Sequence, residues 1–287
     1  MPSARPASCS PTRDPDPARG ILTRMSSRIA VITGASAGIG AALAVRLAKA
    51  GYEPLLLARR ADKLKEVAAR VAAAGGKAHV ETLDVTAPDA AKKALALAKK
   101  KGEVEVLVNN AGRGVYGAFA EASLEDQLAS MDLNMRALVE FTGVFLPEMI
   151  ARKRGYVLNV ASTAAYQANP WQCVYSATKA FVVNFTEGLA VELEGTGASV
   201  TALCPGPTTS EFFEVAGYEK KGMKIPKGVV MSAESVADIG VRAMLKHKAV
   251  VIAGLQNKAG QLATKLAPRA LTTRVVGMIF KGGRGKS

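Results

Sequence analysis

Tyr175 and Lys179 are the residues whose types and spacing most directly suggest chemistry. They lie one helical turn apart in the helical pattern Val174–Glu194, so both side chains project from the same face of that helix. A cation about 5 Å from a phenol, at an effective dielectric constant of about 20, lowers the phenol pKa from about 10 by about two units. We therefore expect Tyr175 to exchange a proton with a carbonyl or alcohol oxygen near neutral pH.

Two further polar residues are placed to assist such a proton transfer. Ser162 stands at the end of the strand pattern Gly155–Val160, where its hydroxyl can hydrogen-bond the substrate oxygen and stabilise a developing alkoxide. Asn134 lies in a helical stretch among leucines and methionines, and a polar side chain there indicates a functional role or a kink. An isolated serine at a strand end is usually structural, so the register with Tyr175 is what favours a catalytic role.

A glycine-rich turn indicates a binding site for an anion. The strand pattern Arg28–Thr33 runs into Gly34-Ala35-Ser36-Ala37-Gly38-Ile39-Gly40, and a helical pattern follows at once. A helix N-terminus offers free N–H groups to a pyrophosphate, and glycines let the backbone approach it closely. A plain tight turn is the alternative reading of the glycines, and their position after the first strand favours the dinucleotide site.

The end of the second strand pattern predicts which dinucleotide is bound. Arg59 and Arg60 stand there, nineteen residues past Gly40, where an acidic residue would accept a hydrogen bond from the adenosine ribose. A guanidinium instead pairs bidentately with a ribose 2′-phosphate, so NADP(H) is favoured over NAD(H). The alternative is that both arginines are simply solvated.

Together these motifs resemble the classical short-chain dehydrogenase/reductase family. The matching segments follow the family's order over about residues 26–250: Thr33–Gly40 (TGxxxGxG), Asp84-Val85, Asn109–Gly112 (NNAG), Asn134, Ser162, Tyr175–Lys179 (YxxxK) and Pro205-Gly206. Ala37 is a departure, because many NADP-dependent members carry a basic residue there, so the phosphate specificity depends on Arg59 with Arg60 in support.

The resemblance implies roles for individual residues. The catalytic set is Asn134, Ser162, Tyr175 and Lys179, in which Lys179 also holds the nicotinamide ribose and Asn134 holds a water that feeds protons to Lys179. The implied cofactor contacts are Gly34, Ser36, Gly38, Ile39, Gly40, Arg59, Arg60, Asp84, Val85, Asn110, Ala111, Gly112, Tyr175, Lys179, Pro205, Gly206 and Thr208.

Alternating strand and helix patterns must position these residues. Strands are predicted at Arg28–Thr33, Glu53–Ala58, Lys77–Leu83, Val104–Asn109, Gly155–Val160, Ser199–Cys204 and Ala249–Ala253, and helices at Ile39–Ala50, Ala61–Ala74, Pro88–Lys101, Ser123–Arg152, Val174–Glu194 and Ala233–Lys246. Ser123 with Asp126, and Ser232 with Ser235, have the spacing of helix N-caps. This alternation predicts an α/β fold, with one doubly wound (Rossmann) domain whose seven-stranded parallel sheet is flanked by helices.

The substrate side is predicted to be apolar. The segment Thr208–Val230 contains Phe212, Phe213, Tyr218, Met223 and Ile225 among charged residues, and it lies where the family carries a mobile substrate loop. Ser162 is expected to contact the substrate, and Gln167, Asn169 and Trp171 are expected to form another wall of the same pocket. This composition favours a hydrophobic ketone or alcohol over a small polar one. Cys173 is expected to pack near the pocket mouth, Cys204 to lie in the core, and His79 and His247 to lie on the surface.

Composition and charge limit the remaining possibilities. The chain has 287 residues, a formal net charge of +14, three cysteines and two histidines, so we expect no disulfide framework and no metal site. Residues 258–287 carry +7 and residues 1–25 carry +2, which leaves +5 for residues 26–257 and argues against nucleic-acid binding. We expect a disordered tail over residues 1–24, a catalytic domain over 25–256, and a basic amphipathic extension over 257–287.

The sequence therefore predicts an NADP(H)-dependent oxidoreductase that interconverts a carbonyl and a secondary alcohol on a lipid-like, steroid-like or 3-oxoacyl substrate. A non-catalytic nucleotide sensor, or an epimerase or dehydratase of the same superfamily, is the alternative. We expect a cytoplasmic homodimer or homotetramer. The C-terminal extension either contacts an anionic membrane or packs on the enzyme or on a sister subunit.

Overall fold

Short runs of buried apolar residues form the centre of one parallel sheet, and the partly buried strands β3 (His79–Thr82) and β7 (Val250–Ile252) form its two edges. The computed structural model describes residues 27–218 and 229–281, and within them the strands are β1 (Arg28–Thr33), β2 (Glu53–Ala58), β3 (His79–Thr82), β4 (Glu103–Asn109), β5 (Gly155–Val160), β6 (Ala198–Cys204) and β7 (Val250–Ile252). Their order in the sheet is β3-β2-β1-β4-β5-β6-β7. Strands buried on both faces read as continuous apolar runs rather than alternating ones, which is why the sequence reveals them.

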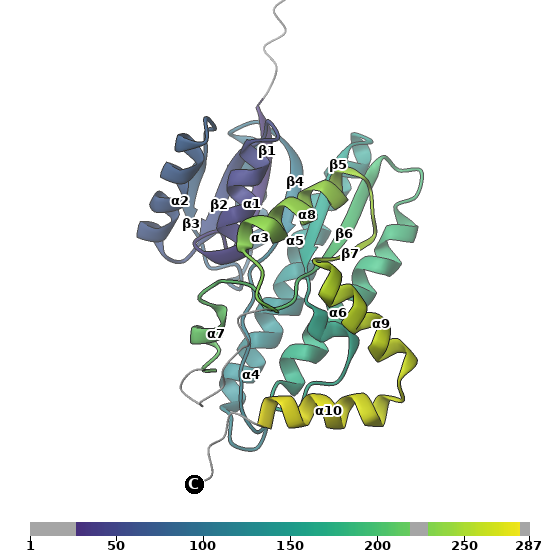
Figure 1. Cartoon of the computed structure of the whole chain (residues 1–287). Coiled ribbons are helices and arrows are strands. Elements are labelled where there is room, and N and C mark those ends of the chain that lie inside the picture. Colours follow the sequence, from purple (N-terminus) through teal and green to yellow (C-terminus); the bar gives the residue numbers. More distant parts are fainter. Residues whose placement is uncertain (1–26, 219–228, 282–287) are drawn as a thin grey trace, which may run out of the picture.

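Helices cover both faces of this sheet (Figure 1). They are α1 (Gly38–Ala48), α2 (Ala61–Ala73), α3 (Ala90–Lys99), α4 (Leu124–Met131), the π-helix η1 (Asp132–Arg136), α5 (Ala137–Ala151), the 3₁₀-helix η2 (Thr163–Tyr166), α6 (Cys173–Glu192), α7 (Phe212–Val215), α8 (Ala233–Leu245), α9 (Leu255–Leu266) and α10 (Arg269–Lys281). One apolar core joins α1, α2 and α8 to the sheet, and two others join α3, α5 and α6 to its opposite face. The predicted doubly wound α/β architecture is confirmed.

The strand order reverses direction at β1. From β1 the chain moves outward to β2 and β3, and it then returns to β4 on the other side of β1. In doubly wound sheets this reversal opens a crevice at the carboxyl ends of the strands, where ligands bind. The glycine turn after β1 and the loops after β4, β5 and β6 therefore meet at one edge of the sheet.

The predicted elements differ from the observed ones in a few places. The single helix expected over Ser123–Arg152 is divided by η1, where the helix widens around Asn134. The helix expected from Pro88 begins at Ala90, because Asp89 adopts a left-handed φ of 57° that belongs to a turn. Both predicted caps are confirmed, since Ser123 Oγ accepts from Asp126 N and Ser232 Oγ accepts from Ser235 N, each at 3.2 Å.

The expected solvent exposure of two residues, Cys173 and His79, is wrong. Cys173 is exposed rather than packed, because it begins α6 at the surface. His79 is partly buried and its Nε2 lies 2.9 Å from a carboxylate oxygen of Glu53. Cys204 is buried, as expected.

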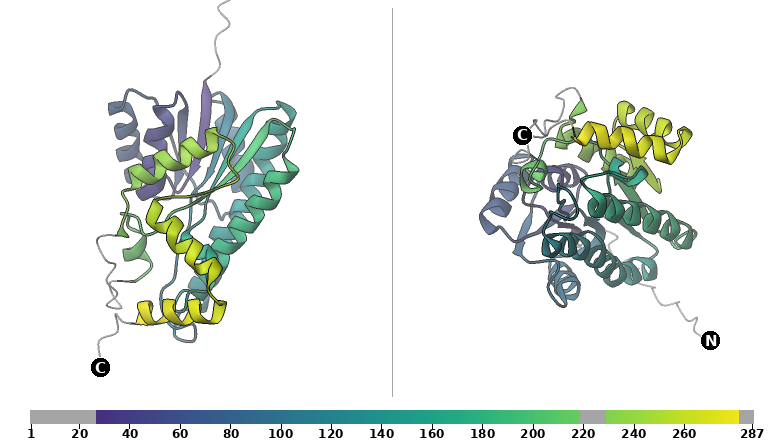
Figure 2. Two further views of the ribbon diagram at one scale, coloured as in Figure 1. Left: turned by 45° about the vertical axis from the view of Figure 1, so that its right-hand side comes forward. Right: turned by 90° about the horizontal axis from the view of Figure 1, so that it is seen from below.

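The remaining sequence-based expectations concern the chain ends and the membrane. The disorder predicted for residues 1–24 and the positions of Met223 and Ile225 lie outside the described residues. Among the residues that the structure describes, no helix is both long and apolar enough to cross a membrane. The C-terminal stretch forms α9 and α10, which lie along the outside of the domain in both views of Figure 2.

Candidate active site

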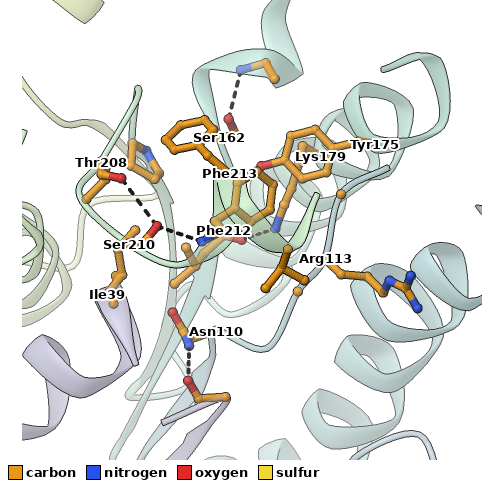
Figure 3. A pocket seen from close by; sticks show the side chains of 18 of the residues that line it. Ile39, Asn110, Arg113, Ser162, Tyr175, Lys179, Thr208, Ser210, Phe212 and Phe213 are labelled. Atoms are coloured by element: carbon orange, nitrogen blue, oxygen red, sulfur yellow. Dashed lines mark hydrogen bonds between the residues drawn. The ribbon is translucent and has the colours of Figure 1, made fainter. Parts of the chain in front are cut away.

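A large cavity occupies the carboxyl edge of the sheet. It measures about 1400 Å³, above the several hundred Å³ typical of small-ligand sites, which leaves room for a dinucleotide and a substrate together. Its walls come from the glycine turn, the ends of β2, β4, β5 and β6, and the helices α6, α7 and α10. Figure 3 shows Ser162, Tyr175 and Lys179 on one side of the cavity, with Phe212 and Phe213 close by.

Lys179 is a buried cation that donates a hydrogen bond to the backbone of β5. Its Nζ donates to Val160 O at 2.7 Å, at the end of β5, and lies 5.8 Å from the centroid of the Tyr175 ring. Its side chain is almost fully buried. Burial disfavours the charged form and lowers the pKa of Lys179 from 10.5 to about 8.

Tyr175 corrects the electrostatic argument made from the sequence. Burial raises the pKa of its phenol to about 12, and the hydrogen bond to Ser162 opposes that rise only in part. The net shift is upwards, opposite to the one expected from the sequence, because burial penalises the phenolate and the Lys179 Nζ donates its hydrogen bond to Val160 O rather than to the phenol. The Tyr175 ring packs against Phe212 with a centroid separation of 5.2 Å, which orients the phenol within the cavity.

Ser162 is fixed by its position at the start of η2. Its Oγ accepts a hydrogen bond from Ala164 N at 3.1 Å, so the lone pair is used locally and the hydroxyl proton remains available for donation. The same hydroxyl interacts with Tyr175. The serine and the tyrosine therefore lie together, as the spacing predicts.

Asn134 lies behind the cavity wall rather than in it. Its Nδ2 lies 2.9 Å from both Arg113 O and Thr178 Oγ1, and its Oδ1 accepts from Arg113 N at 3.0 Å. Asn134 is not among the described residues that line the cavity. A Cβ added to Gly112 would come within 3.2 Å of Asn134 Oδ1 and 3.4 Å of Lys179 Nζ. Asn134 thus positions the loop after β4 beside Lys179, and it lies in the π-helix η1 that interrupts the expected α-helix.

The glycine turn fits a pyrophosphate. Gly34 and Gly38 have φ of 64° and 53°, and a Cβ on Gly38 would lie 2.8 Å from the Ser210 Cβ. A Cβ on Gly40 would meet Asn110 Nδ2 at 2.4 Å, so this glycine permits close packing of α1 and does not itself line the cavity. The N-cap of α1 is Ala37, which has no side chain able to cap, and the first N–H groups of the helix remain available to an anion.

The two arginines after β2 are not equivalent. Both line the cavity, but the Arg60 guanidinium donates to Glu211 Oε2 at 2.7 Å and to Ser36 Oγ at 3.2 Å. Arg59 is exposed, and its guanidinium makes no hydrogen bond to any residue that the structure describes. The two guanidinium groups of Arg59 and Arg60 are hydrogen-bond donors of the kind that binds a phosphate monoester. Glu211 is an acidic neighbour that the sequence argument missed.

The other implied nucleotide residues lie in the same cavity. The lining includes Gly34, Ser36, Gly38, Ile39, Asp84, Val85, Asn110, Ala111, Gly112, Pro205, Gly206 and Thr208. Asn110 Nδ2 donates to Thr33 O and Gly34 O at 2.9 and 3.0 Å, which ties the loop after β4 to the glycine turn. The Asp84 carboxylate accepts two hydrogen bonds from Thr86, which lower its pKa.

The substrate side agrees with the prediction in part. Gln167, Phe212 and Phe213 line the cavity, whereas Trp171 is not among the described lining residues. Trp171 has a φ of 70°, and its Nε1 lies 3.5 Å from Gly277 O of α10. The sequence argument placed Trp171 in the wall because it stands between Ser162 and Tyr175, but its indole faces the C-terminal helix instead.

The C-terminal helix contributes lining residues that the sequence argument did not assign to the site. They are Val276, Met278, Ile279 and Phe280. Tyr116 Oη donates to Phe280 O at 2.7 Å, and this tyrosine stacks on Tyr218 with ring centroids 4.7 Å apart. In the sequence, only an aromatic residue near the end of the basic C-terminal stretch, Phe280, could have indicated that this helix lines the site.

Comparisons with known proteins agree with this geometry. A family model described as short chain dehydrogenase matches residues 28–220. The ketoacyl reductase HetN of Nostoc sp. is 32% identical over 250 residues, which cover 85% of this chain and 84% of that protein. Serine 3-dehydrogenase of Rhizobium radiobacter is 36% identical over 213 residues, 72% of this chain and 84% of that protein.

A solved structure extends the likeness to three dimensions. A short-chain dehydrogenase from Sphingobium yanoikuyae in complex with NADPH superposes with a TM-score of 0.71 at 27% identity, covering 85% of this chain and 97% of that one. The family match also spans the glycine turn and the Tyr175–Lys179 pair. The chain therefore belongs to the short-chain dehydrogenase family of oxidoreductases.

Proposed function

We propose that the protein reduces a hydrophobic ketone to a secondary alcohol with NADPH. The observation that carries the proposal is the placement of Tyr175 and Ser162 beside Lys179 in a cavity whose outer wall is aromatic and aliphatic. A bound nicotinamide supplies the hydride. The residues of the chain then have to hold the carbonyl and deliver a proton to its oxygen.

Tyr175 is suited to proton donation. Because its pKa is about 12, the phenol stays protonated at neutral pH and can give its proton to a carbonyl oxygen as negative charge develops there. The Ser162 hydroxyl can donate a second hydrogen bond to the same oxygen. Lys179 is charged below pH about 8, and with its Nζ 5.8 Å from the centroid of the Tyr175 ring its charge favours, through space, the phenolate left behind. A phenol that is protonated at rest favours the reductive direction.

The cavity walls favour an apolar substrate. Phe212, Phe213, Val276 and Phe280 border the region beyond Tyr175. Such side chains recognise alkyl or ring surfaces through the area removed from water, at roughly 25 cal/mol per Å². The name of the relative HetN, a ketoacyl reductase, supports a 3-oxoacyl-like substrate. The other relative is named a serine 3-dehydrogenase. Serine is small and polar, so a substrate like it would not contact this apolar wall.

NADPH is proposed over NADH on the strength of Arg59. Arg59 lines the cavity beyond the end of β2 and makes no side-chain hydrogen bond to the described residues, whereas Arg60 donates to Glu211. The NADPH in the Sphingobium yanoikuyae complex supports the same choice. We expect Arg59→Ala to raise KM for NADPH about 10- to 100-fold and to change KM for NADH little, because a charged hydrogen bond to the 2′-phosphate is lost.

The matched control for Arg59 is Arg70→Ala. Arg70 is an exposed arginine of α2 that pairs with Glu234 outside the cavity, so its removal leaves both KM values unchanged. Equal effects of Arg59→Ala on NADPH and NADH would overturn the phosphate assignment.

The reaction itself is tested with a series of ketones. Purified protein is mixed with NADPH and with methyl ketones of increasing chain length, and the loss of NADPH absorbance is followed. We expect kcat/KM to rise about 3- to 4-fold for each added methylene, since each buried CH₂ is worth about 0.8 kcal/mol. Turnover of small polar ketones in preference to the long ones would contradict the substrate class.

A further inference from the structure

The two C-terminal helices carry exposed apolar stripes. On α10 the stripe consists of Leu271, Val275, Met278 and Ile279, and on α9 it consists of Leu255, Leu262 and Leu266. The exposed fractions of these side chains range from 41% for Val275 to 82% for Leu255. Their spacings of three, four and seven residues place each set on one helix face. Two adjacent helices thus present apolar faces that no described residue covers.

The orientation of both helices is fixed by contacts on their other faces. On α10, Phe280 O accepts a hydrogen bond from Tyr116, and Gly277 lies so close to Pro170 that an added Cβ would come within 3.2 Å of its ring. On α9, Asn257 Nδ2 donates to Ala253 O at 2.6 Å, which anchors the first turn. The stripe residues that do not line the cavity therefore face away from the body of the domain. Both helices lie at the periphery of the domain (Figure 2).

The positive charge of α9 and α10 favours an anionic bilayer over a second copy of this chain as the partner. Residues 255–281 contain five basic residues and no acidic one: Lys258, Lys265, Arg269, Arg274 and Lys281. In a symmetric dimer built on this face, each positive helix pair would meet another one. An anionic bilayer surface instead attracts juxtaposed Lys and Arg by about 1 kcal/mol each, and its acyl region accepts the apolar stripe of an amphipathic helix.

The outer stripe is continuous with the wall of the cavity. Met278 and Ile279 are more than half exposed, and both also line the cavity together with Val276 and Phe280. One helix therefore presents apolar side chains to the outside and to the proposed substrate site. A surface that contacted α10 would lie next to the mouth of the cavity.

We propose that α9 and α10 form a docking surface for a bilayer containing anionic phospholipid, with the cavity mouth held at the interface. The apolar stripes enter the boundary of the acyl chains while the basic residues contact phosphate headgroups. This surface goes beyond the proposed ketone reduction, and vesicle binding is measured without turnover. If vesicle binding fails, the proposed ketone reduction is unaffected, and if ketone reduction fails, the proposed docking surface is unaffected.

The test is vesicle flotation of the full chain. Vesicles of phosphatidylcholine alone are compared with vesicles containing phosphatidylglycerol. Neutralising two charges in Lys265→Gln/Arg274→Gln is expected to lower the partition constant for anionic vesicles about 30-fold. The matched control is Lys100→Gln/Lys101→Gln, which removes the same charge from exposed positions after α3. This control is expected to bind like the unaltered protein.

A second pair of variants tests the apolar contribution. Leu262→Ser/Leu266→Ser/Leu271→Ser changes only exposed residues that do not line the cavity, and it should weaken vesicle binding while its melting temperature and ketone turnover stay the same. Leu245→Ser, at the exposed end of α8, is its control. The proposal is overturned if the unaltered protein does not float with anionic vesicles. Equal losses in the control charge variant, or self-association through these leucines without vesicle binding, would also overturn it.

Discussion

Replacing Lys179 by methionine should stabilise the protein while abolishing its activity. The pKa of Lys179 is lowered by burial from 10.5 to about 8. Each pKa unit corresponds to about 1.4 kcal/mol, so holding this side chain charged at pH 7 costs about 3 kcal/mol of folding free energy. Lys179→Met removes that cost. It also leaves Val160 O without its hydrogen-bond donor, which lowers the free energy of unfolding by about 1 kcal/mol. The expected net gain is about 2 kcal/mol.

The pH dependence has a definite sign. The folded-state pKa of Lys179 lies below the unfolded-state value, so between pH 8 and 10.5 the unfolded chain binds more protons than the folded one. Stability of the unaltered protein attributable to this group therefore rises with pH through that window and is lost as the pH falls through 8. The advantage of Lys179→Met should shrink as the pH rises towards 10.5.

The assay is urea unfolding followed by circular dichroism at pH 7 and at pH 10. Lys100→Met, at an exposed position, is the matched control and should change the free energy of unfolding by less than about 0.5 kcal/mol. A variant Lys179→Met that is less stable than the unaltered protein at pH 7 would refute the reasoning. A stability difference that does not shrink at high pH would refute it as well.

Two further predictions concern the site. Ketone reduction, measured as kcat/KM between pH 6 and 10, should fall above pH about 8 because Lys179 loses its charge there, and a flat profile through that range would contradict this role. Gly38→Ala should weaken NADPH binding about 10-fold or more in a fluorescence titration, because a Cβ at a φ of +53° would also lie 2.8 Å from Ser210 Cβ. Gly143→Ala, in α5 with no atom within 4 Å of the added Cβ, is the control and should bind NADPH normally.

The sheet and the nucleotide edge can be predicted from the sequence because each local pattern has one dominant cause. The strands read as apolar runs, and Gly34 and Gly38 stand where the backbone needs a positive φ. The spacing of Tyr175 and Lys179 places them on one helix face whatever surrounds them. These features depend on near neighbours in the chain.

The remaining features depend on contacts between distant segments. The Tyr175 pKa is set by its burial and by its hydrogen bond to Ser162, and neither can be read from the four-residue spacing. The partners of Trp171 and Tyr116 lie on α10, more than a hundred residues further along the chain. The Arg60–Glu211 pair likewise joins two loops, and its geometry exists only in the folded protein.

The most direct test of the central claim is NADPH-dependent ketone reduction by Tyr175→Phe. Loss of the phenolic proton should lower kcat about 100-fold or more while NADPH binding and the melting temperature stay the same. Tyr166→Phe is the matched control, because Tyr166 lies in η2 outside the cavity lining and its hydroxyl contacts Cys204. Turnover that is lost in Tyr175→Phe and kept in Tyr166→Phe is the predicted result, and undiminished turnover in Tyr175→Phe would contradict the account.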